Sequence, residues 1–259
     1  MMSDSISAVL LSAGYATRLH PLTLETPKAL LPLGRGVMLD EVCASLERVP
    51  DIAQTILVSN HRFVRHYEAW QRQRHLSIEL LDDGTSTAET RLGAIRDLAM
   101  AMERIPSSRD ILVVGTDNLF DWDLADFTRF AASKRPSASI ATWEVGSDEE
   151  ASRCGVVTRD ADGRIRQFFE KPAHPSSRLV ALCVYYVPAP VRPRVQEFLA
   201  SGGNADAPGF FIAWLSGQEP VYGFVAQGRW FDVGTIAAYE EAKTQWSRSA
   251  SSSKERKHA

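Results

Sequence analysis

The chain reads Leu11-Ser-Ala-Gly-Tyr-Ala-Thr-Arg-Leu-His-Pro-Leu-Thr-Leu-Glu-Thr-Pro-Lys28 directly after an apolar run from Ile6 to Leu11. A short apolar run bounded by turn residues is typical of a buried β-strand. The segment after it supplies small residues and two cations, Arg18 and Lys28. A glycine-bearing turn lets backbone N–H groups approach a polyphosphate, and the two cations can neutralise its charge. The sequence therefore predicts a strand that leads into a phosphate-binding loop.

This segment resembles the signature of the sugar-nucleotide nucleotidyltransferases, which is roughly G-x-G-T-R-L-x-P-x-T-x-x-x-P-K. The residues in register are Gly14, Thr17, Arg18, Leu19, Pro21, Thr23, Pro27 and Lys28. Enzymes of this family join a nucleoside triphosphate to a phosphorylated acceptor and release pyrophosphate. Ala16 stands where most members carry a second glycine. Because alanine disfavours a positive φ, we expect ordinary backbone angles at Ala16.

The resemblance implies that this segment binds the nucleotide. It also implies that Arg18 and Lys28 act in catalysis, by stabilising the charge of the triphosphate and of the pyrophosphate that leaves. The residues expected to bind nucleotide here are Leu11, Ala13, Gly14, Tyr15, Ala16, Thr17, Arg18 and Lys28. A dehydrogenase is disfavoured, since the chain lacks G-x-G-x-x-G at this point and places no acidic residue to meet a ribose.

The composition excludes several classes of partner. The 259 residues carry a net charge of −3, so no basic field attracts nucleic acid or an anionic membrane. No apolar run approaches the roughly 18 residues of a membrane span, and no signal peptide is apparent. The three cysteines form no C-x-x-C pair, which argues against a disulfide framework or a zinc site. We therefore expect a cytoplasmic protein with no nucleic-acid and no membrane partner.

Short apolar runs alternate with helical patterns through the first half of the chain. Strands are expected at 6–11, 55–59, 77–81 and 110–115, and helices at 38–49, 64–74 and 92–102. Such alternation of apolar strands with helices predicts a mostly parallel sheet that is covered on both faces. The expected fold class is α/β, a Rossmann-like three-layer α/β/α arrangement around a mostly parallel mixed sheet.

The second half is less regular, and we expect it to extend the sheet. Strands are expected at 139–145, 155–158, 165–169, 179–187 and 221–225. The pair Asp162-Gly163 indicates a hairpin turn between two of them. Neither an internal repeat nor a linker divides the chain, so one domain is expected over residues 1–246. The polar, serine-rich tail at 247–259 is expected to be disordered.

Two aspartates are candidate metal ligands. Asp117 closes an apolar strand in Val113-Val-Gly-Thr-Asp-Asn118, and Asp232 lies in Trp230-Phe-Asp-Val-Gly-Thr235. Carboxylate oxygens at a cleft mouth suit Mg²⁺, although an isolated aspartate at such a place is otherwise a cap or a turn residue. The two motifs are similar to the family's Gly-Asp-Asn and Trp-x-Asp-Ile-Gly-Thr segments, with Thr116 in place of the first glycine. The resemblance implies that Asp117 and Asp232 are catalytic and that Mg²⁺ is the cofactor.

The segment GVVTRDADGRIRQFFEKP, residues 155–172, is similar to the family's G-V-V…D-x-x-G-x-I…F-x-E-K-P. By this resemblance, Lys171 is catalytic and meets the acceptor phosphate, while Glu170 and Gly155 bind the sugar. A surface ion pair at a strand end is the alternative. Cys183 stands where many members have a glycine lining the sugar pocket, so we include it among the acceptor-binding residues. No adjacent base is indicated, so we do not expect this thiol to be a nucleophile.

The choice of base is left open by the segment between Asp82 and Gly93. Thr90 and Arg91 are candidate readers of the nucleotide, together with Gly93 at the start of the next helix. Helix capping and solvent exposure explain the first two equally well. The expected partners are a nucleoside triphosphate and a phosphorylated small-molecule acceptor. A homo-oligomer is compatible with the sequence.

The expected function is transfer of a nucleotide to a sugar 1-phosphate, which yields an NDP-sugar and pyrophosphate by in-line attack on the α-phosphorus. A cytidylyltransferase for a small non-sugar phosphate or phosphonate, such as phosphocholine, is the alternative, kept open by Cys183 and the loop around Thr90. A non-catalytic nucleotide-binding regulator is disfavoured, because such a protein would be expected to lose one of the cations or carboxylates, and none is lost.

Overall fold

The computed structural model describes the backbone of residues 5–255 and the side chains of residues 5–246. The strands are β1 (Ile6–Leu11), β2 (Pro32–Leu33), β3 (Gly36–Val37), β4 (Ile52–Ser59), β5 (Glu79–Asp82), β6 (Asp110–Gly115), β7 (Asn118–Phe120), β8 (Ala138–Glu144), β9 (Gly155–Arg159), β10 (Ile165–Glu170), β11 (Leu179–Val187), β12 (Val221–Val225) and β13 (Trp230–Asp232). The helices are α1 (Met38–Leu46), α2 (Val64–Arg74), α3 (Ala94–Met102), α4 (Leu124–Ser133), α5 (Asp148–Ala151), α6 (Pro193–Ala200), α7 (Pro208–Ser216) and α8 (Ile236–Glu255). Short 3₁₀ helices are η1 (Thr17–Leu19), η2 (Lys28–Leu30), η3 (Ala88–Thr90) and η4 (Ala189–Val191).

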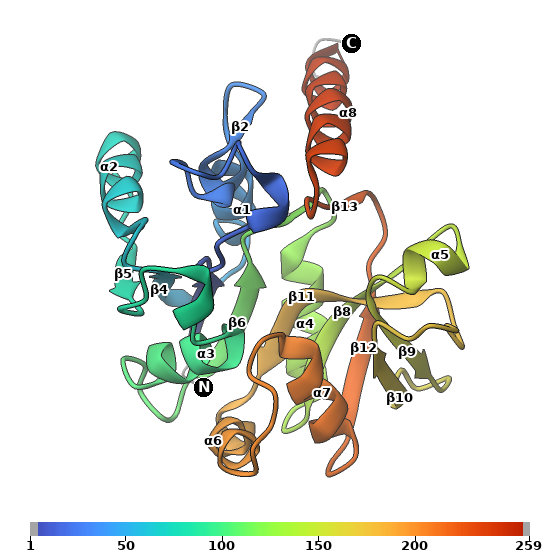
Figure 1. Cartoon of the computed structure of the whole chain (residues 1–259). Helices are drawn as coiled ribbons and strands as arrows, with labels where there is room; N and C mark the ends of the chain where they lie inside the picture. Colours follow the sequence, from blue (N-terminus) through green and yellow to red (C-terminus); the bar gives the residue numbers. More distant parts are fainter. Residues whose placement is uncertain (1–4, 256–259) are drawn as a thin grey trace.

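A nine-stranded mixed sheet runs through the molecule in the order β10-β9-β11-β6-β1-β4-β5, with β8 joined to β11 and β12 joined to β8 (Figure 1). Strands β5, β4, β1 and β6 are parallel to one another, as the alternation of strands and helices predicts. Strand β11 enters antiparallel to β6 and pairs antiparallel with β8 and β9. The register places Leu11 beside Gly115, so the carboxyl ends of β1 and β6 lie side by side.

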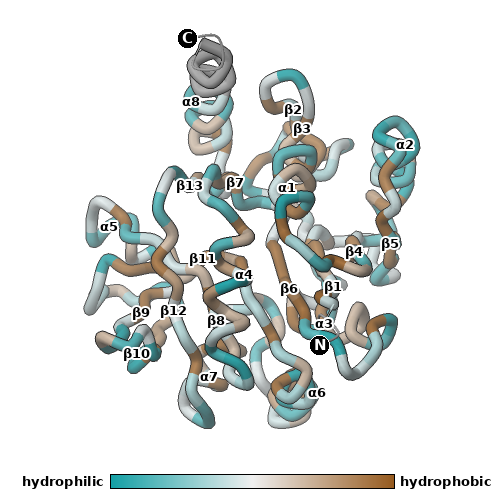
Figure 2. Tube along the Cα trace, turned by 180° about the vertical axis from the view of Figure 1, so that it is seen from behind, coloured by the Kyte–Doolittle hydropathy of each residue, from teal (hydrophilic) through white to brown (hydrophobic). Residues whose placement is uncertain are grey.

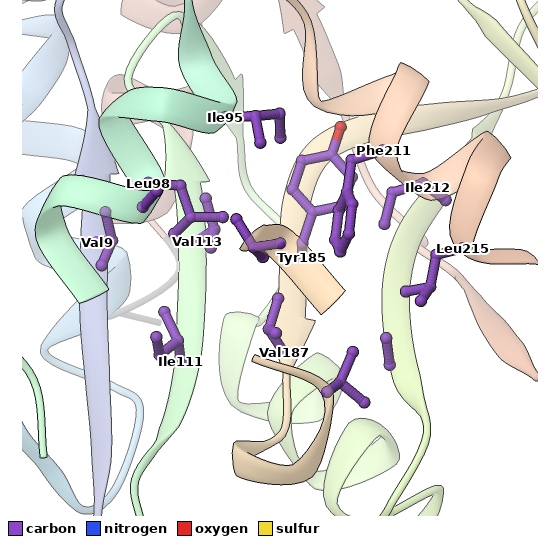
Figure 3. Close-up of a cluster of buried hydrophobic side chains, with 14 of the residues drawn as sticks. Val9, Ile95, Leu98, Ile111, Val113, Tyr185, Val187, Phe211, Ile212 and Leu215 are labelled. Carbon is purple, nitrogen blue, oxygen red and sulfur yellow. The ribbon is translucent and has the colours of Figure 1, made fainter. Parts of the chain in front are cut away.

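Helices cover both faces of this sheet and complete three layers. On one face, Ile95 of α3 and Phe211 of α7 pack in the same cluster as Val113 of β6 (Figure 3). On the other face, Phe127 of α4 packs in a cluster with Val114, the next residue of β6. Because successive side chains of a strand point to opposite faces, one apolar strand serves both clusters. Figure 2 shows the hydrophobic colour of β6 and the hydrophilic colour of α2 on the periphery. The α/β three-layer class is confirmed.

Several expected elements have the predicted bounds, among them α2, β6, β11 and β12. The hairpin between β9 and β10 is also confirmed, with Gly163 in the left-handed region at φ 84°. Helices α4 and α6 and the two small sheets β2-β3 and β7-β13 were not expected. The small sheets consist of strands of two or three residues. Segments so short carry no periodic pattern, so only their pairing in space defines them.

The expectation of ordinary backbone angles at Ala16 is wrong. This residue has φ 47° and ψ 41°, which is the left-handed conformation. Its carbonyl oxygen accepts hydrogen bonds from the Thr23 hydroxyl at 2.8 Å and from the Leu19 backbone N–H at 2.9 Å. A left-handed alanine costs about 1–2 kcal/mol, and these two bonds to the same carbonyl hold the turn in place against that cost.

Helix α8 continues to Glu255 and therefore enters the segment for which we expect disorder. Once a helix is nucleated, each further residue adds one hydrogen bond that roughly offsets the backbone entropy it loses, so a polar segment can continue the helix. Residues 256–259, the end of the expected tail, lie outside the described residues. Among the described helices, none combines the length and the apolar character that crossing a membrane requires.

Candidate functional site

A cavity of about 830 Å³ opens where the carboxyl ends of β1 and β6 meet. One wall comes from the loop after β1 and the start of α3, and the opposite wall comes from β10, β11 and the start of α7. The predicted site residues that line it are Leu11, Ala13, Gly14, Ala16, Arg18, Lys28, Arg91, Gly93, Asp117, Gly155, Glu170, Lys171, Cys183 and Asp232. The fold therefore assembles the nucleotide, metal and acceptor motifs of the sequence around one space.

Side-chain hydrogen bonds hold the loop after β1 in place beside the cavity. The Ser12 hydroxyl lies 2.6 Å from the Tyr67 hydroxyl and 2.8 Å from the Thr116 hydroxyl. The side-chain amide of Asn60 donates to the carbonyl oxygen of Ala13 at 2.9 Å. A Cβ atom added at Gly14 would meet nothing within 4 Å. The loop thus presents backbone to open space, which suits the close approach of a ligand.

Three predicted nucleotide-binding residues do not line the cavity. Tyr15 is buried, and its hydroxyl lies 3.0 Å from the Thr85 hydroxyl. Thr17 is exposed at the start of the 3₁₀ helix η1. The Thr90 hydroxyl donates to the carbonyl oxygen of Thr87 at 3.1 Å. The Tyr15 and Thr90 side chains hydrogen-bond within the loops that surround the cavity.

A chain of polar contacts orients the first aspartate. The Lys28 ammonium lies 3.1 Å from Asp117 Oδ2, and the Asn118 amide donates to Asp117 Oδ1 at 2.8 Å. Asn118 in turn accepts a 2.8 Å hydrogen bond from the Trp230 indole. Burial alone would raise the pKa of Asp117, but Lys28 and the Asn118 amide outweigh it and hold the pKa below its ordinary value. Strand pairing of β7 with β13 sets Asp232 opposite Asn118.

Four other charged residues of the site influence the pKa of the second aspartate, Asp232. Desolvation and then the neighbouring charge of Asp117 raise the pKa of Asp232 above its ordinary value. Lys28, Arg18 and Lys171 act in the opposite direction. These groups come from the beginning, the middle and the end of the chain. Their electrostatic influence on one carboxylate shows that the fold has collected them in a small volume.

The two aspartates fit a hard divalent cation. Their mutual repulsion, seen in the raised pKa of Asp232, is the kind that a bound cation relieves. Mg²⁺ prefers oxygen ligands and usually takes only one or two protein carboxylates, with water and phosphate oxygens completing its shell. Among the described residues, no group of three or more His, Cys, Asp or Glu side chains is placed to hold a metal. A magnesium ion here would therefore share its coordination with a phosphate.

Two glycines in the wall formed by β9, β10 and α7 pack closely against neighbouring side chains. A Cβ atom at Gly155 would lie 2.6 Å from Phe168 Cζ, and one at Gly209 would lie 2.1 Å from Glu170 Oε2. Real Cβ atoms do not approach so closely, so either side chain would displace Phe168 or Glu170. Gly209 belongs to the first turn of α7, a segment that the sequence marks by its turn residues. The Glu170 carboxylate is thereby held between β9 and α7.

Lys171 and Cys183 lie in the same part of the cavity. The Lys171 ammonium is 3.6 Å from Glu170 Oε1 and its side chain remains 62% exposed, so it is free to meet an anion. Cys183 packs beside Gly115, where an added Cβ atom would come within 2.7 Å of the sulfur. Burial and then the charge of Asp117 raise the pKa of the Cys183 thiol. A neutral thiol is a poor nucleophile, in agreement with the expectation from the sequence.

Sequence reasoning missed several residues of the cavity wall, namely Asp83, Asp97, Arg153, Cys154, Tyr185, Asp206 and Gly209. One signal was available for Asp97, because it interrupts the apolar face that Ile95 and Leu98 form on α3. Asp206 pairs with the predicted Arg91 at 2.7 Å, which joins the loop before α3 to the loop before α7. No local pattern shows such a contact between distant loops.

Comparison with known proteins agrees with this geometry. A mannose-1-phosphate guanylyltransferase catalytic subunit beta from Drosophila pseudoobscura pseudoobscura is 29% identical over 240 residues, which cover 90% of this chain and 60% of that protein. A protein of Sulfolobus acidocaldarius, assigned as a mannose-1-phosphate guanyltransferase, is 28% identical over 236 residues, or 90% of this chain and 61% of that one. This chain thus spans about 60% of the length of these relatives.

A crystal structure from Bacillus anthracis, assigned as a glucose-1-phosphate thymidylyltransferase in complex with a sucrose, has the same fold. The TM-score is 0.79 at 19% sequence identity, over 94% of this chain and 96% of the other. The model of the nucleotidyl transferase family matches residues 7–249, which is most of the chain and includes every motif described above. The chain belongs to the nucleotidyl transferase family.

Proposed function

We propose that this protein transfers a nucleotide from a nucleoside triphosphate to a sugar 1-phosphate, with release of pyrophosphate and formation of an NDP-sugar. The observation that carries the proposal is that one cavity is lined by three cations, Arg18, Lys28 and Lys171, and by the carboxylates of Asp117 and Asp232. The Lys28 ammonium lies 3.1 Å from Asp117 Oδ2. Cations gathered around a carboxylate pair suit a reaction in which two phosphate-bearing substrates must approach each other. The relatives named as mannose-1-phosphate guanylyltransferases support a sugar phosphate as the acceptor.

The chemistry requires no covalent intermediate, because an ionised acceptor phosphate is itself a nucleophile. An acceptor oxygen attacks the α-phosphorus in line, and the bond to the leaving pyrophosphate breaks. The chain's task is then to position the substrates and to stabilise charge. Arg18 and Lys28 hold the triphosphate and balance the charge of the pyrophosphate. Lys171 holds the acceptor phosphate against the repulsion of the nucleotide phosphates.

Asp117 and Asp232 are the residues that would hold Mg²⁺, which supplies further charge neutralisation at the phosphates when bound. The Lys28 ammonium pairs with Asp117. This pair keeps the carboxylate ionised, since it holds the pKa of Asp117 below its ordinary value despite burial. An ionised carboxylate is the form that binds a cation.

Glu170 and the glycines around it support a sugar as the acceptor. The carboxylate is mostly buried between tightly packed backbone segments, yet it lines the cavity. A buried carboxylate at a cavity wall can accept hydrogen bonds from sugar hydroxyls. A small phosphate such as phosphocholine is the second candidate, because the Cys183 side chain also lines this end of the cavity and takes up space there.

Pyrophosphate release by the purified protein tests the proposal. ATP, CTP, GTP, UTP and dTTP are each combined with hexose 1-phosphates and with small alcohol phosphates in the presence of Mg²⁺. Turnover with one nucleotide and a hexose 1-phosphate supports the proposal, and turnover only with an alcohol phosphate supports the second candidate. The Asp117→Asn protein is the control for contaminating activity. Nucleotide binding without turnover on any acceptor would contradict both candidates and favour a regulatory role.

A further inference from the structure

Three buried hydroxyl groups form a hydrogen-bonded chain in the wall of the cavity. The Tyr67 hydroxyl lies 2.6 Å from the Ser12 hydroxyl, which lies 2.8 Å from the Thr116 hydroxyl. The Thr116 hydroxyl in turn lies 3.1 Å from the carbonyl oxygen of Leu11. All three side chains line the cavity, although Tyr67, Ser12 and Thr116 are only 0%, 8% and 3% exposed. The proposed transfer chemistry uses none of these hydroxyls.

The direction of every hydrogen bond in this chain follows from the number of protons. A carbonyl oxygen can only accept, so the single proton of the Thr116 hydroxyl goes to Leu11. Thr116 Oγ1 then accepts from the Ser12 hydroxyl, and Ser12 Oγ accepts from the Tyr67 hydroxyl. Burial raises the pKa of Tyr67 above its ordinary value, so this hydroxyl keeps its proton. Because all three protons are used within the chain, the chain holds its members in place instead of donating to a ligand.

The hydroxyl chain crosses the carboxyl ends of three neighbouring strands. Strands β4, β1 and β6 are adjacent and parallel in the sheet (Figure 2). Ser12 and Thr116 are the first residues after β1 and β6, and Tyr67 belongs to α2, the helix that follows β4. The paired residues of β1 and β6 end at Leu11 and Gly115. The hydroxyls therefore extend the link between these strands beyond the last residue pair of the sheet.

The ends of the hydroxyl chain adjoin groups that the proposed reaction needs. Thr116 directly precedes Asp117, the carboxylate that pairs with Lys28 at 3.1 Å. Ser12 directly precedes Ala13 and Gly14, which line the cavity in the loop after β1. A change in the distance between the two hydroxyls would therefore move the aspartate relative to this loop. Groups that act in catalysis have to be held within about 0.5 Å of the productive geometry.

We propose that the hydroxyl chain of Tyr67, Ser12 and Thr116 positions the Asp117 carboxylate against the loop after β1. The chain thereby sets the spacing between the cation that Asp117 would hold and the triphosphate beside the loop. The inference rests on the proposed function and assigns positioning residues to the same site. A carboxylate and a phosphate oxygen can share one Mg²⁺ only at a fixed spacing, because Mg²⁺ demands short oxygen distances in nearly ideal octahedral geometry.

Two substitutions of Thr116 separate the hydroxyl from the shape of the side chain. Valine has nearly the shape of threonine but no hydroxyl, whereas serine keeps the hydroxyl. Thr116→Val should lower kcat about 10-fold and raise the Mg²⁺ concentration for half-maximal rate about 10-fold, the scale of one buried hydrogen bond. The KM of the acceptor should not change. Thr116→Ser should keep most of the wild-type kcat and the wild-type Mg²⁺ dependence.

Nucleotide binding without acceptor gives a readout that does not depend on turnover. Isothermal titration measures the Kd of ATP, CTP, GTP, UTP and dTTP, once with Mg²⁺ and once with EDTA. Mg²⁺ should tighten the binding of the accepted nucleotide to the wild type and to Thr116→Ser. In Thr116→Val this tightening should be about 10-fold smaller. The Kd in EDTA should be similar in all three proteins, because the hydroxyl chain acts on the spacing of the cation and not on the fold of the site.

Thr128→Val is the matched control for the loss of a buried threonine hydroxyl. Thr128 is buried, and its hydroxyl donates to the carbonyl oxygen of Ala125 at 3.0 Å within α4, but the residue does not line the cavity. This variant should keep the wild-type kcat and Mg²⁺ dependence. Tyr67→Phe removes the other end of the hydroxyl chain and should act in the same direction as Thr116→Val. Because both act through Ser12, the double variant should lose less than the product of the two single losses.

A Thr116→Val protein with the wild-type kcat and Mg²⁺ dependence would overturn the positioning role and leave nucleotidyl transfer intact. Equal impairment of Thr116→Ser and Thr116→Val would overturn it as well, and so would a Kd that rises equally with Mg²⁺ and with EDTA. Failure of the wild type to bind or turn over any of the five nucleotides would overturn the proposed function together with the inference. If Thr116→Val does not fold, Tyr67→Phe decides by the same measurements.

Discussion

The nucleotide side and the acceptor side of the cavity use glycine in opposite ways. A Cβ atom at Gly14 would meet nothing within 4 Å, whereas at Gly155 and Gly209 it would lie 2.6 Å from Phe168 and 2.1 Å from Glu170. On the nucleotide side the glycine borders space that a ligand can fill. On the acceptor side the space is already filled by the protein. In the proposed function, nucleotide binding depends on exposed backbone at the loop after β1, and acceptor binding depends on the packing of antiparallel strands against α7.

The largest loss of activity is expected for a substitution of Asp117, which lies where the two sides of the cavity meet. Asp117→Asn removes the charge that pairs with Lys28 and that would hold Mg²⁺, so kcat should fall by at least about 10². Steady-state pyrophosphate release at saturating substrates and Mg²⁺ measures it. The control is Asp126→Asn, because Asp126 is an exposed carboxylate of α4 that pairs with Arg129. Near-normal turnover of Asp117→Asn would remove this residue from the metal site.

The contrast between the glycines is tested by making the same substitution on each side. Gly155→Ala forces a methyl group into Phe168 and should destabilise the protein by about 1–3 kcal/mol. Gly14→Ala should change the free energy of unfolding by less than about 0.5 kcal/mol, because the methyl group enters open space. It should instead weaken the binding of nucleoside triphosphates. Urea unfolding and nucleotide titration measure the two quantities, and equal losses of stability would contradict the comparison.

The buried carboxylate of α3 should make stability depend on pH. The pKa of Asp97 is raised from its ordinary 3.8 to about 7 by burial and by Asp83. Between these values the unfolded chain releases its proton while the folded protein keeps it, so stability falls as pH rises and levels off above the folded pKa. Asp97→Asn should therefore unfold at about the wild-type temperature at pH 4. At pH 8 it should unfold about 10 °C above the wild type, because raising the pKa from 3.8 to about 7 costs the folded wild type about 4 kcal/mol at that pH, and each ~1 kcal/mol moves the unfolding temperature by about 2–4 °C in a domain of this size.

Thermal unfolding of both proteins in ligand-free buffer at several pH values between 4 and 8 checks this expectation. Taking the difference between variant and wild type cancels the titration of the groups that do not interact with Asp97, which leaves Asp97 and its neighbour Asp83. A constant difference across the range would show that Asp97 titrates normally. A difference that grows toward pH 4 would have the wrong sign.

The smallest change in the free energy of unfolding is expected for the ion pair between Arg91 and Asp206, which links the two sides of the cavity. Arg91 and Asp206 lie 2.7 Å apart, but both side chains are about half exposed. Exposed pairs contribute less than about 1 kcal/mol, since water and salt screen them. A double-mutant cycle with Arg91→Ala and Asp206→Ala, read by urea unfolding at low and high salt, should give a coupling within that range. A coupling well above 1 kcal/mol that persists in high salt would make this pair a structural tie between the two sides.

Much of the fold could be predicted, because apolar runs and helical spacing are local properties. Strand β6 and helix α2 have their predicted bounds for this reason. The direction of single side chains in the motif could not be predicted. Tyr15 belongs to the signature loop, yet its hydroxyl pairs with Thr85, a residue far along the chain. The motif predicts which segment borders the cavity, and the partners of each side chain decide which residues face into it.

The sequence by itself determined most strands of the main sheet, three of the helices that cover it and the family, and it predicts a phosphate-binding loop, because these follow from local periodicity and from continuous motifs. Only the tertiary structure decided that Ala16 is left-handed and that β7 and β13 bring Asp232 beside Asp117. It alone placed Asp83 and Asp97 in one wall. The physical reason is the same in each case. These features depend on hydrogen bonds, burial and charge interactions between residues far apart in the chain. A local sequence pattern does not specify such interactions.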